Sequence, residues 1–443
     1  MDKAGNENVT SLLKSKRFYI VLLLFFNIVI NYVDRINLSV AGPLISKEFG
    51  WDAGTMGIIF SSFLWTYALA LIPSGWLADK YGSRVVNAGS ITIWSVGAIL
   101  TGAITNFGNM LAARWVLGAG EAASYPLAGK IVRQWFPASE RATAVAIYNA
   151  GAFAGPALAT PIAAWLVVET GWRLSFVILG SLGFIWLYFW LKKFQIPEEC
   201  TWLPEDEKQY IIATRDNQAG PQKVAASSKP IKISLGKIFS QKTMWGIFVS
   251  QGCIVYSQYL FLTWLPSYLV QARGMQLMKA GIFSALPFVI AVVLGIIVGR
   301  ISDKLLDAEK IRQGKRRTAV IIAMLVSSVV LLTNMVENEY LVLALISISL
   351  TAVSSSLTLN FALTNDLISE PRIAGTVIGS QVLGGNTFGL MAPIVTGFIV
   401  KATGSFTSAF VLAGGLLIFG AFMSYAFTRK PIVYEVDEEA DVA

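Results

Sequence analysis

The sequence predicts an all-α membrane protein in which twelve transmembrane helices form two pseudo-symmetric six-helix bundles. Three observations lead to this fold class: the composition, the spacing of the apolar segments and an internal repetition. The chain has 443 residues, of which 55% are hydrophobic and 14% are charged, and its mean hydropathy is +0.60. A water-soluble protein of this length needs far more charge, so the composition indicates a polytopic protein of the lipid bilayer.

The apolar segments are long enough to cross a bilayer, which takes about 20 residues of helix. The longest polar stretch between two of them follows the sixth segment and divides the chain into three parts. We predict an N-terminal bundle over 1–193, a cytoplasmic linker with a short amphipathic helix over 194–242, and a C-terminal bundle with a short cytoplasmic tail over 243–443. The predicted helices span 18–40, 54–77, 85–105, 109–134, 142–166, 173–193, 243–270, 278–300, 318–336, 340–364, 373–399 and 405–427.

Basic residues are concentrated in every second loop. The loops after even-numbered helices are rich in lysine and arginine, whereas those after odd-numbered helices contain few. By the positive-inside rule this pattern places both termini in the cytoplasm, and we expect a bacterial inner membrane. The same pattern accounts for the net charge of +8 without a nucleic-acid partner, because the charges mark topology and do not form a phosphate-binding face.

Several kinds of chemistry are excluded or disfavoured by composition. The sequence contains no histidine, which rules out a histidine-based metal site, catalytic triad or proton switch. Cys200 and Cys253 fall in a loop and in a predicted helix, so we expect no disulfide framework. No cleavage-site pattern follows the first apolar segment, and we expect no signal peptide. We therefore predict no catalytic residue, no metal and no cofactor, and we disfavour a membrane-embedded enzyme.

The two halves of the chain repeat one another. "SGWLADKYGSR" (74–84) after the second predicted helix returns as "VGRISDKLL" (298–306) after the eighth. "TGWRLSFVILG" (170–180) at the sixth returns as "TGSFTSAFVLAG" (403–414) at the twelfth. Chance similarity of apolar stretches is the alternative, but both echoes fall at equivalent positions. Duplicated six-helix units are a common architecture of transporters, and they disfavour a channel with a fixed pore.

Four charges lie inside predicted helices. Asp34 and Arg35 are in the first helix, and Arg114 and Glu121 are in the fourth. A charge at the centre of a membrane helix costs about 2.5–3.5 kcal/mol, so it usually faces an aqueous cavity and has a function. Arg114 and Glu121 share one helix face about 10 Å apart, and Asn27, Asn31 and Leu38 continue the face of Asp34 or Arg35. We expect both stripes to line a central cavity.

The residue types indicate what these charges can do. The planar guanidinium of Arg35 can bind two carboxylate oxygens at once, although an ion pair with Asp34 or Glu121 is an alternative. Burial disfavours the ionised form of a carboxyl group, so Asp34 and Glu121 could take up and release a proton. Arg114 favours the ionised form of Glu121 when it is close, and its movement could switch protonation. A static buried salt bridge that fixes helix packing remains the alternative for both acids.

The loop Gly75-Trp-Leu-Ala-Asp79-Lys-Tyr-Gly82-Ser-Arg84 resembles the signature loop of the major facilitator superfamily. Its glycines allow a tight turn and close helix packing, and Asp79 can sit at a helix N-terminus and favour one closed state. An ordinary loop with a topology-setting charge is the alternative. With the repeated segment, the resemblance implies gating roles for Gly75, Asp79, Arg84 and Asp303.

Three further stretches narrow the resemblance. They are "NYVDRINLSVA" (31–41), "RWVLGAGEAASYP…WFPASERATA" across the fourth and fifth helices, and "FLTWLPSYLVQARG" (261–274). Together they resemble the anion:cation symporters, which include bacterial sugar-acid carriers and vertebrate sialin-like carriers. The resemblance covers nearly the whole chain. It implies a monomer that takes up a small organic carboxylate, such as a sugar acid, together with protons by alternating access.

The same resemblance implies residue roles. Arg35 matches the anion anchor of the sugar-acid carriers, and Asp34 and Glu121, with Arg114, match residues of proton coupling. Aromatic and polar residues that match substrate-facing positions complete the set, although single tyrosines are often packing residues and the glycines around Asn386 can equally serve helix packing. The substrate-binding candidates besides Arg35 are Tyr32, Tyr67, Tyr259, Gln381 and Asn386.

The sequence departs from the sugar-acid carriers at two positions. Ala152 stands where they often have a glutamine, and Val382, beside Gln381, stands where they often have an asparagine. Fewer donors and acceptors indicate a substrate with fewer or differently placed hydroxyl groups. Gly151 and Gly155 partly match a motif of drug/proton antiporters, but small residues four apart are a general device for helix packing. An exporter or antiporter of organic anions or drugs is the alternative function.

Overall fold

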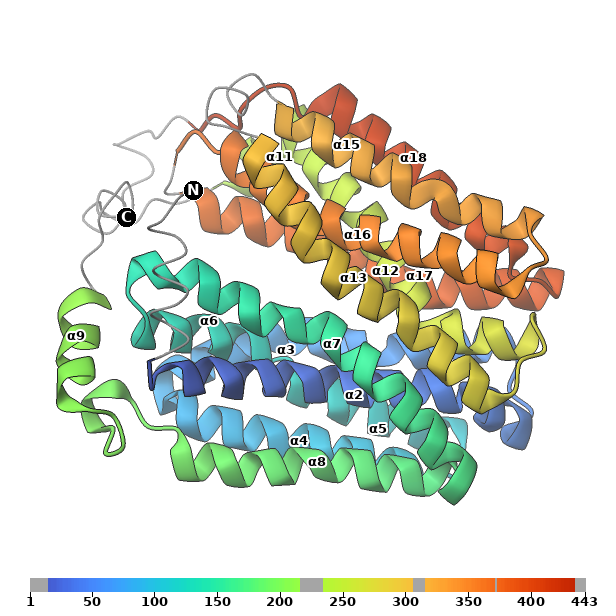
Figure 1. Cartoon of the computed structure of the whole chain (residues 1–443), viewed down its shortest axis with the longest axis horizontal. Helices are drawn as coiled ribbons and strands as arrows, with labels where there is room; N and C mark the ends of the chain where they lie inside the picture. The colour runs from blue at the N-terminus through green and yellow to red at the C-terminus, as the bar shows by residue number, and fades with distance from the viewer. Residues whose placement is uncertain (1–14, 216–233, 306–314, 371–372, 435–443) are drawn as a thin grey trace. The chain divides into compact units, whose positions relative to one another are not determined.

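The computed structural model describes residues 15–215, 234–305, 315–370 and 373–434 (Figure 1). Each of the twelve predicted membrane segments is helical in it, which confirms the all-α fold class. Within these ranges, ten helices are long and apolar enough to cross a membrane. The other two segments are the fourth, which is divided into two shorter helices, and the seventh, which carries polar residues such as Ser250 and Gln251.

The first six predicted segments form seven helices, followed by two short ones. Helix ends agree with the prediction to within a few residues in most cases, and the largest extension is in α2. The helices are α2 (Phe18–Phe49), α3 (Ala53–Tyr81), α4 (Ser83–Gly102), α5 (Phe107–Glu121), α6 (Ser124–Trp135), α7 (Ala138–Thr170), α8 (Trp172–Lys193), η1 (Pro197–Glu199) and α9 (Glu205–Arg215).

The second half follows the same plan. Its ninth predicted segment begins as an α-helix and ends as a 3₁₀-helix, a tighter form that is frequent at helix termini. The elements are α11 (Leu235–Phe239), α12 (Lys242–Gln271), α13 (Leu277–Leu305), α15 (Lys315–Ser327), η2 (Ser328–Met335), α16 (Glu339–Leu367), α17 (Ala374–Thr403) and α18 (Thr407–Phe427).

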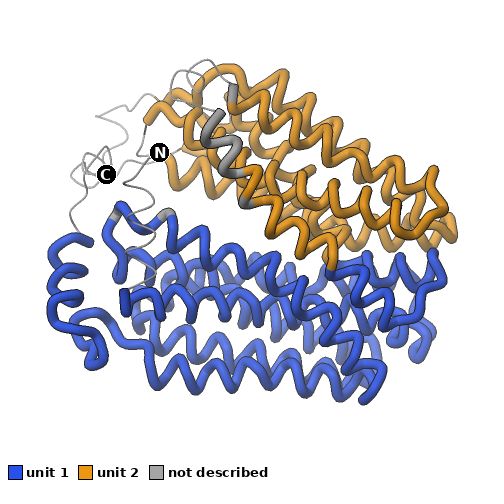
Figure 2. Tube along the Cα trace, viewed as in Figure 1, with its two compact units in different colours: residues 1–218, 263–285 blue, residues 219–262, 286–443 orange. Residues whose placement is uncertain are grey.

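The chain forms two compact units, which Figure 2 draws in different colours. Unit 1 comprises residues 1–218 and 263–285, and unit 2 comprises residues 219–262 and 286–443. These limits differ from the predicted ones because the end of α12 and the start of α13 pack within unit 1. There the Ser39 hydroxyl donates to the Thr263 carbonyl at 2.7 Å, and the rings of Phe60 and Trp264 meet edge to face at 5.1 Å.

In unit 1, α2 packs along α7, and α4 packs between α5 and α8 (Figure 1). Glycines make the closest approaches. A Cβ on Gly151 would lie 2.9 Å from the Phe25 carbonyl oxygen, and one on Gly155 would lie 2.6 Å from the Cβ of Tyr32. The pair of small residues on α7 therefore serves helix packing, as the sequence predicted.

The fourth predicted helix, 109–134, is wrong as a single element. The α5 helix ends at Glu121, and α6 begins at Ser124. Pro126 contributes to the interruption, since it has no N–H for the carbonyl of Ala122 four residues earlier, but it is not sufficient, because α2 and α3 continue through Pro43 and Pro73. Glu121 is consequently the last residue of a helix and is not embedded in the middle of one.

One hydrophobic core cluster of unit 2 is built from four helices. Cys253 and Ile254 of α12 pack against residues of α15, α16 and α18, all of them almost fully buried. Cys253 and Cys200 are both buried free thiols. The α17 helix approaches α12 through glycines, because a Cβ on Gly384 would lie 2.5 Å from the Phe248 carbonyl oxygen.

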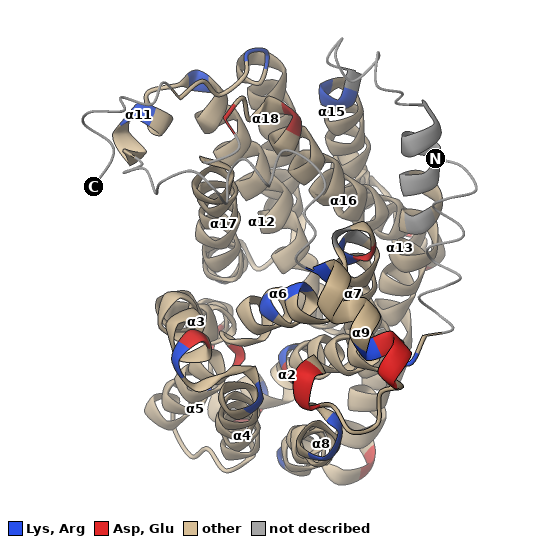
Figure 3. Cartoon of the chain, turned by 90° about the vertical axis from the view of Figure 1, so that its left-hand side faces the viewer, with Lys and Arg blue, Asp and Glu red and all other residues tan. Residues whose placement is uncertain are grey.

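The predicted linker contains the short helix α9, which buries Ile211 and leaves its other residues exposed or partly exposed. Arg17, at the start of α2, fixes α9 to unit 1. Its guanidinium contacts Glu140 of α7 at 2.7 Å and Glu207 of α9 at 3.0 Å, and it is only 5% exposed. Figure 3, which looks onto this end of unit 1, shows charged residues gathered around α6, α7, α8 and α9. Residues 216–233 of the predicted linker lie outside the described ranges.

Candidate functional site

Arg35 and Glu121 form a buried ion pair in unit 1. The Nε of Arg35 donates to Oε2 of Glu121 at 2.8 Å, and its Nη2 lies 2.6 Å from the same oxygen. The side chain of Arg35 is 5% exposed and that of Glu121 is 0% exposed. Of the ion pairs that the sequence left open for Arg35, the structure contains the one with Glu121.

Aromatic rings surround the guanidinium of Arg35. Its Cζ lies 4.9 Å from the ring centroid of Tyr32, 4.8 Å from that of Phe63 and 5.5 Å from that of Tyr67. The guanidinium of Arg114 lies over the same Phe63 ring at 5.1 Å. Cation–π contacts of desolvated guanidinium groups are worth about 2 kcal/mol. Tyr32 and Tyr67 are thus next to Arg35, and Phe63 is a member of the site that the sequence did not single out.

Asp34 and Arg114 are the other two charged residues of this group, and with them some of its polar atoms still lack a hydrogen bond. Both are almost fully buried, and the structure contains no ion pair between Arg114 and Glu121. Among the described residues, Oε1 of Glu121, Oδ2 of Asp34, and Nε and Nη1 of Arg114 are buried atoms without a hydrogen bond. Buried polar atoms in proteins are nearly always hydrogen-bonded, so these are groups that water or a polar ligand would satisfy.

The polar face of α2 continues from these charges. Asn27 and Asn31 are buried, as are Asp34, Arg35 and Leu38, but every residue of α2 from Asn27 to Gly42 is buried, so burial does not single out the stripe predicted from the sequence. The amide of Asn31 donates to the Ser124 hydroxyl at 3.3 Å, across to the start of α6. Asn31 of α2 therefore contacts the chain at the junction between α5 and α6.

Unit 2 holds the other substrate-binding candidates. Gln381 of α17 is fully buried, and its Nε2 donates to Oε1 of Gln251 at 3.1 Å. The same oxygen accepts a hydrogen bond from Nδ2 of Asn360 at 2.9 Å. Tyr259 packs its ring against Gly389, whereas Asn386 is partly exposed on α17. The amide network of Gln251, Asn360 and Gln381 joins α12, α16 and α17.

Gln251 and Asn360 are not among the residues predicted from the sequence, although the sequence contains a signal for them. Both are amide side chains inside predicted membrane segments, "IFVSQGCIV" and "LTLNFAL". Polar residues in such positions are rare and usually face the bundle interior.

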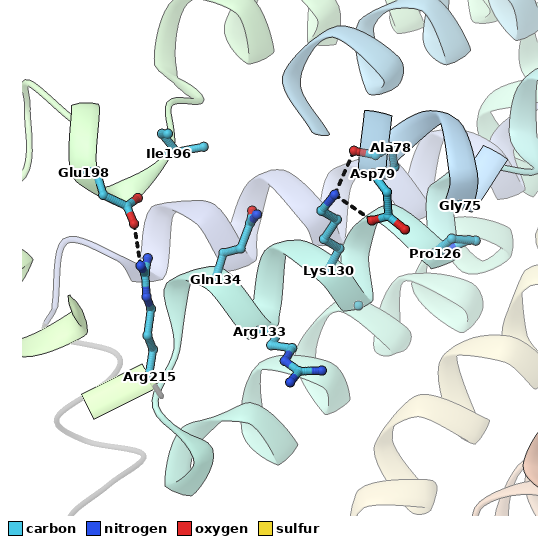
Figure 4. Close-up of a pocket in the computed structure, with 11 residues that line it drawn as sticks. Gly75, Ala78, Asp79, Pro126, Lys130, Arg133, Gln134, Ile196, Glu198 and Arg215 are labelled. Carbon is cyan, nitrogen blue, oxygen red and sulfur yellow. Dashed lines mark hydrogen bonds and ion pairs between the residues drawn. The ribbon is translucent and has the colours of Figure 1, made fainter. Parts of the chain in front are cut away.

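Two of the gating candidates line a pocket of about 730 Å³ in unit 1 (Figure 4). Asp79 accepts a hydrogen bond from Nζ of Lys130 at 2.8 Å, and Lys130 also donates to the Ala78 carbonyl at 2.7 Å. Asp79 lies in the last turn of α3 and not at a helix N-terminus, which corrects the expectation. A carboxylate near a helix C-terminus is unfavourable, and the ammonium group of Lys130 offsets it. Gly75, also on this pocket, would have nothing within 4 Å of an added Cβ among the described atoms.

The remaining members of the signature loop turn the chain and tie α4 to α8. Gly82 has a φ of +81°, a conformation that favours glycine, and so permits the tight connection from α3 to α4. A guanidinium nitrogen of Arg84 donates to the carbonyl of Leu191, and the indole of Trp190 donates to the carbonyl of Arg84 at 3.0 Å. Asp303 belongs to α13, but its side chain lies outside the described part of the structure.

The residues of the Glu198–Arg215 pair stand at the far rim of the same pocket (Figure 4). The guanidinium of Arg215 donates to the carboxylate of Glu198, and this hydrogen bond lowers the pKa of Glu198. Arg141 in turn donates to the Arg215 carbonyl at 2.6 Å. The pocket is therefore bounded on one side by α3 and α6 and on the other by the stretch that carries η1 and α9.

Known proteins resemble this chain over most of its length. The probable galactarate/D-glucarate transporter of Escherichia coli (strain K12) is 36% identical over 409 residues, which cover 90% of each protein. The D-galactonate transporter of Escherichia coli O6:H1 (strain CFT073) is 30% identical over 413 residues, 93% of this chain and 95% of the relative. These relatives are sugar-acid transporters and not enzymes.

A solved structure shares the fold. The crystal structure of a bacterial homolog of the human lysosomal transporter Spinster, in an inward-facing and occupied conformation, matches with a TM-score of 0.74 at 17% identity, over 94% of this chain and 97% of that one. The family model of the Major Facilitator Superfamily matches residues 24–370. With twelve helical segments, a signature loop and this match, the chain belongs to the Major Facilitator Superfamily.

Proposed function

We propose that this protein is a proton-coupled symporter that takes up an organic carboxylate, such as a sugar acid. The observation that carries the proposal is the buried pair of Arg35 and Glu121, with its polar neighbours that lack hydrogen bonds. An arginine in this setting suits a carboxylate, because its guanidinium stays charged and offers parallel donors. The names of the similar transporters support the substrate class.

Charge balance supports coupling to protons. Asp34 and Glu121 together carry −2 and Arg35 and Arg114 carry +2, so the buried group is neutral when all four are ionised. An anionic substrate that enters alone leaves an uncompensated charge in a poorly solvated place, which is expensive. A proton taken up by Glu121 or Asp34 restores neutrality. Substrate and proton would therefore enter together.

The geometry suggests how the exchange occurs. Arg35 holds only one oxygen of Glu121, so protonation of Glu121 would weaken the pair and free the guanidinium for the substrate carboxylate. Tyr32 and Tyr67 would then bind the substrate next to that carboxylate. In this scheme Asp34 and Arg114 share the proton-coupling role, and Arg114 stabilises the ionised acid after proton release.

Gln381, Tyr259 and Asn386 of unit 2 are also proposed to bind substrate, because they match substrate-facing positions of the sugar-acid carriers. Ala152 and Val382 lack the polar groups expected for a substrate with many hydroxyls, which favours an acid with fewer or differently placed ones. The transport cycle would be alternating access by a monomer with bundles over 1–193 and 243–443. Gly75, Asp79, Arg84 and Asp303 would gate it, with both termini in the cytoplasm of a bacterial inner membrane.

Uptake into proteoliposomes tests the proposal. Vesicles that are acidic outside should accumulate one member of a panel of sugar acids and other carboxylates, and collapse of the gradient should abolish the accumulation. Glu121→Gln should lose gradient-driven accumulation while exchange of labelled for unlabelled substrate persists, because glutamine keeps the shape but cannot ionise. Glu48→Gln, which alters an exposed pair with Arg173, is the matched control.

Two results would count against the proposal. Accumulation that needs the opposite gradient would favour an exporter or antiporter. Accumulation that survives Glu121→Gln would make Glu121 a structural residue.

A further inference from the structure

The end of α5 fixes where the carboxylate of Glu121 lies. Glu121 is the last residue of α5, and Ala122 and Ala123 separate it from α6. Ala122 and Ala123 keep helical dihedral angles, but the carbonyl groups next to Glu121 are not all bonded within this segment, because Pro126 has no N–H for the Ala122 carbonyl. These carbonyls need other donors in a buried place.

Hydroxyl groups from neighbouring helices supply the donors. The Ser90 hydroxyl of α4 donates to the Gly120 carbonyl, one residue before Glu121. The Ser74 hydroxyl of α3 lies 3.5 Å from the Ala122 carbonyl oxygen, the group that Pro126 cannot bond, and also donates to Leu71 within its own helix at 2.7 Å. Ser90 thus makes the closer of the two contacts across helices.

Close packing brings Ser90 within reach. A Cβ on Gly120 would lie 2.5 Å from the backbone nitrogen of Trp94 on α4, and one on Gly118 would lie 2.0 Å from the Phe63 carbonyl oxygen. Only glycine permits α4 and α3 to approach α5 so closely at these positions. Ser90 is 6% exposed, so water does not readily replace its hydrogen bond.

We propose that Ser90 is a positioning residue for Glu121. Its hydroxyl holds the Gly120 carbonyl and thereby keeps the Glu121 carboxylate against Arg35 at the interruption of the fourth membrane segment. This inference deepens the proposed function, on which the importance of Glu121 for coupling rests. Loss of the hydroxyl would loosen the contact with Arg35, and the protonated form of Glu121 would then persist to higher pH.

Ser90→Ala tests this role through pH dependence. The pH at which gradient-driven uptake is half-maximal should rise by about half to one unit, the size expected for one buried neutral hydrogen bond. Substrate affinity in exchange at low pH should change less than about twofold. Ser90→Thr, which keeps a hydroxyl, should restore the wild-type profile. Thr92→Ala is the matched control, because Thr92 is exposed on α4 and donates to the Ala88 carbonyl of its own helix at 2.9 Å.

An infrared measurement keeps this test independent of transport. The carboxyl band that disappears in Glu121→Gln should titrate at higher pH in Ser90→Ala and at the wild-type pH in Thr92→Ala, even if the protein proves to be an exporter. If Ser90→Ala does not fold, Ser90→Cys, with its weaker donor, should show a smaller shift in the same direction. An unchanged titration in the folded variant, or equal shifts in Ser90→Ala and Ser90→Thr, would overturn the proposal.

Discussion

The two units bury different kinds of polar groups. In the described part of the chain, every charged side chain that is buried lies in unit 1: Arg17, Asp34, Arg35, Arg114, Glu121 and Glu140. Unit 2 buries amides and hydroxyls instead, among them Gln251, Asn360 and Gln381. The halves repeat one another in sequence and helix order, so this difference is superimposed on a common architecture.

The polar atoms of the two groups are also satisfied to different extents. The amides of unit 2 bond one another but leave Oε1 of Gln381 without a hydrogen bond, whereas the charges of unit 1 leave atoms of Asp34, Arg114 and Glu121 without one. A neutral network that is nearly closed can stay the same through a transport cycle. An open charged group can change its protonation and its partner. On the proposed function, unit 1 thus handles charge and unit 2 discriminates among uncharged substrate groups.

The largest effect should follow from removing the arginine of unit 1. Arg35→Ala should weaken substrate binding by about thirtyfold or more, since loss of one partner of a buried charge pair costs about 2–5 kcal/mol. Equilibrium binding of the acid that the wild type accumulates measures this. Arg173→Ala is the control, because Arg173 pairs with Glu48 at 2.6 Å but both side chains are 44% exposed.

A companion variant separates the anchor from a stability effect. Arg35→Ala leaves Glu121 buried and unpaired, which alone destabilises the fold. In the double variant Arg35→Ala/Glu121→Gln, residue 121 is no longer a buried charge that has lost its partner, and binding should still be lost. Near-normal affinity in either folded variant would mean that Arg35 is not the anion anchor, and the contrast between the units would lose its functional meaning.

A smaller effect of a different kind should follow from changing unit 2. Gln251→Leu removes the acceptor shared by Asn360 and Gln381 with little change of volume. Relative KM values among sugar acids that differ in one hydroxyl group should change by about tenfold, because two neutral hydrogen bonds are involved. The pH dependence of uptake should stay the same, because no ionisable group is altered.

Ser257→Ala provides the matched control for this change. Ser257 is buried on the same helix, but its hydroxyl bonds the Cys253 carbonyl of its own helix at 3.3 Å. The Ser257→Ala variant should show the same relative KM values among sugar acids as the wild type. A shifted pH profile in Gln251→Leu would show that unit 2 takes part in proton coupling after all.

Much of the fold could be predicted because membrane helices are specified locally. The start of α2 at Phe18 agrees with the prediction, but its end at Phe49 lies nine residues beyond the predicted end at 40. The polar residues Ser46, Lys47 and Glu48 remain helical, and the helix stops only where Gly50 adopts a φ of +65°. The chain turns at Gly50, so the position of this glycine indicates the end of the helix better than the point at which hydrophobicity falls.

The site could be predicted in part. Spacing of 3.6 residues per turn was enough to put Arg114 and Glu121 on one face, and the cost of buried charge marked both as functional. Which acid pairs with Arg35 could not be deduced, since that depends on how α2 and α5 are placed by the helices that pack around them. The interruption after Glu121 was missed because Pro126 is a poor signal in this chain, where Pro43 and Pro73 lie inside continuous helices.

We expect the smallest effect on stability from changing an exposed ion pair of unit 1. Comparison with the buried pair of Arg35 and Glu121 shows whether charge stabilises the protein only where it is buried. Asp79 and Lys130 form an ion pair with side chains 78% and 28% exposed. Exposed pairs contribute about 0–1 kcal/mol, so Asp79→Asn should hardly change thermal unfolding in detergent. If Asp79 is a gating residue, the maximal uptake rate should nevertheless fall by about fivefold, which corresponds to a shift of about 1 kcal/mol between conformational states.

Lys130→Gln tests whether slower uptake in Asp79→Asn comes from loss of the ion pair or from loss of the Asp79 carboxylate itself. Lys130 also bonds the Ala78 carbonyl at the end of α3, so its loss should lower stability slightly more than the loss of Asp79 does. If the ion pair itself holds one conformational state, each single variant and the double variant should slow uptake to the same extent. A stability loss as large as that caused by Arg35→Ala would contradict the argument, because charge in unit 1 would then matter without burial. If the Asp79 and Lys130 variants are as stable as the wild type but transport more slowly, charge contributes to stability mainly in the buried group around Arg35. The exposed pair then affects the rate of transport.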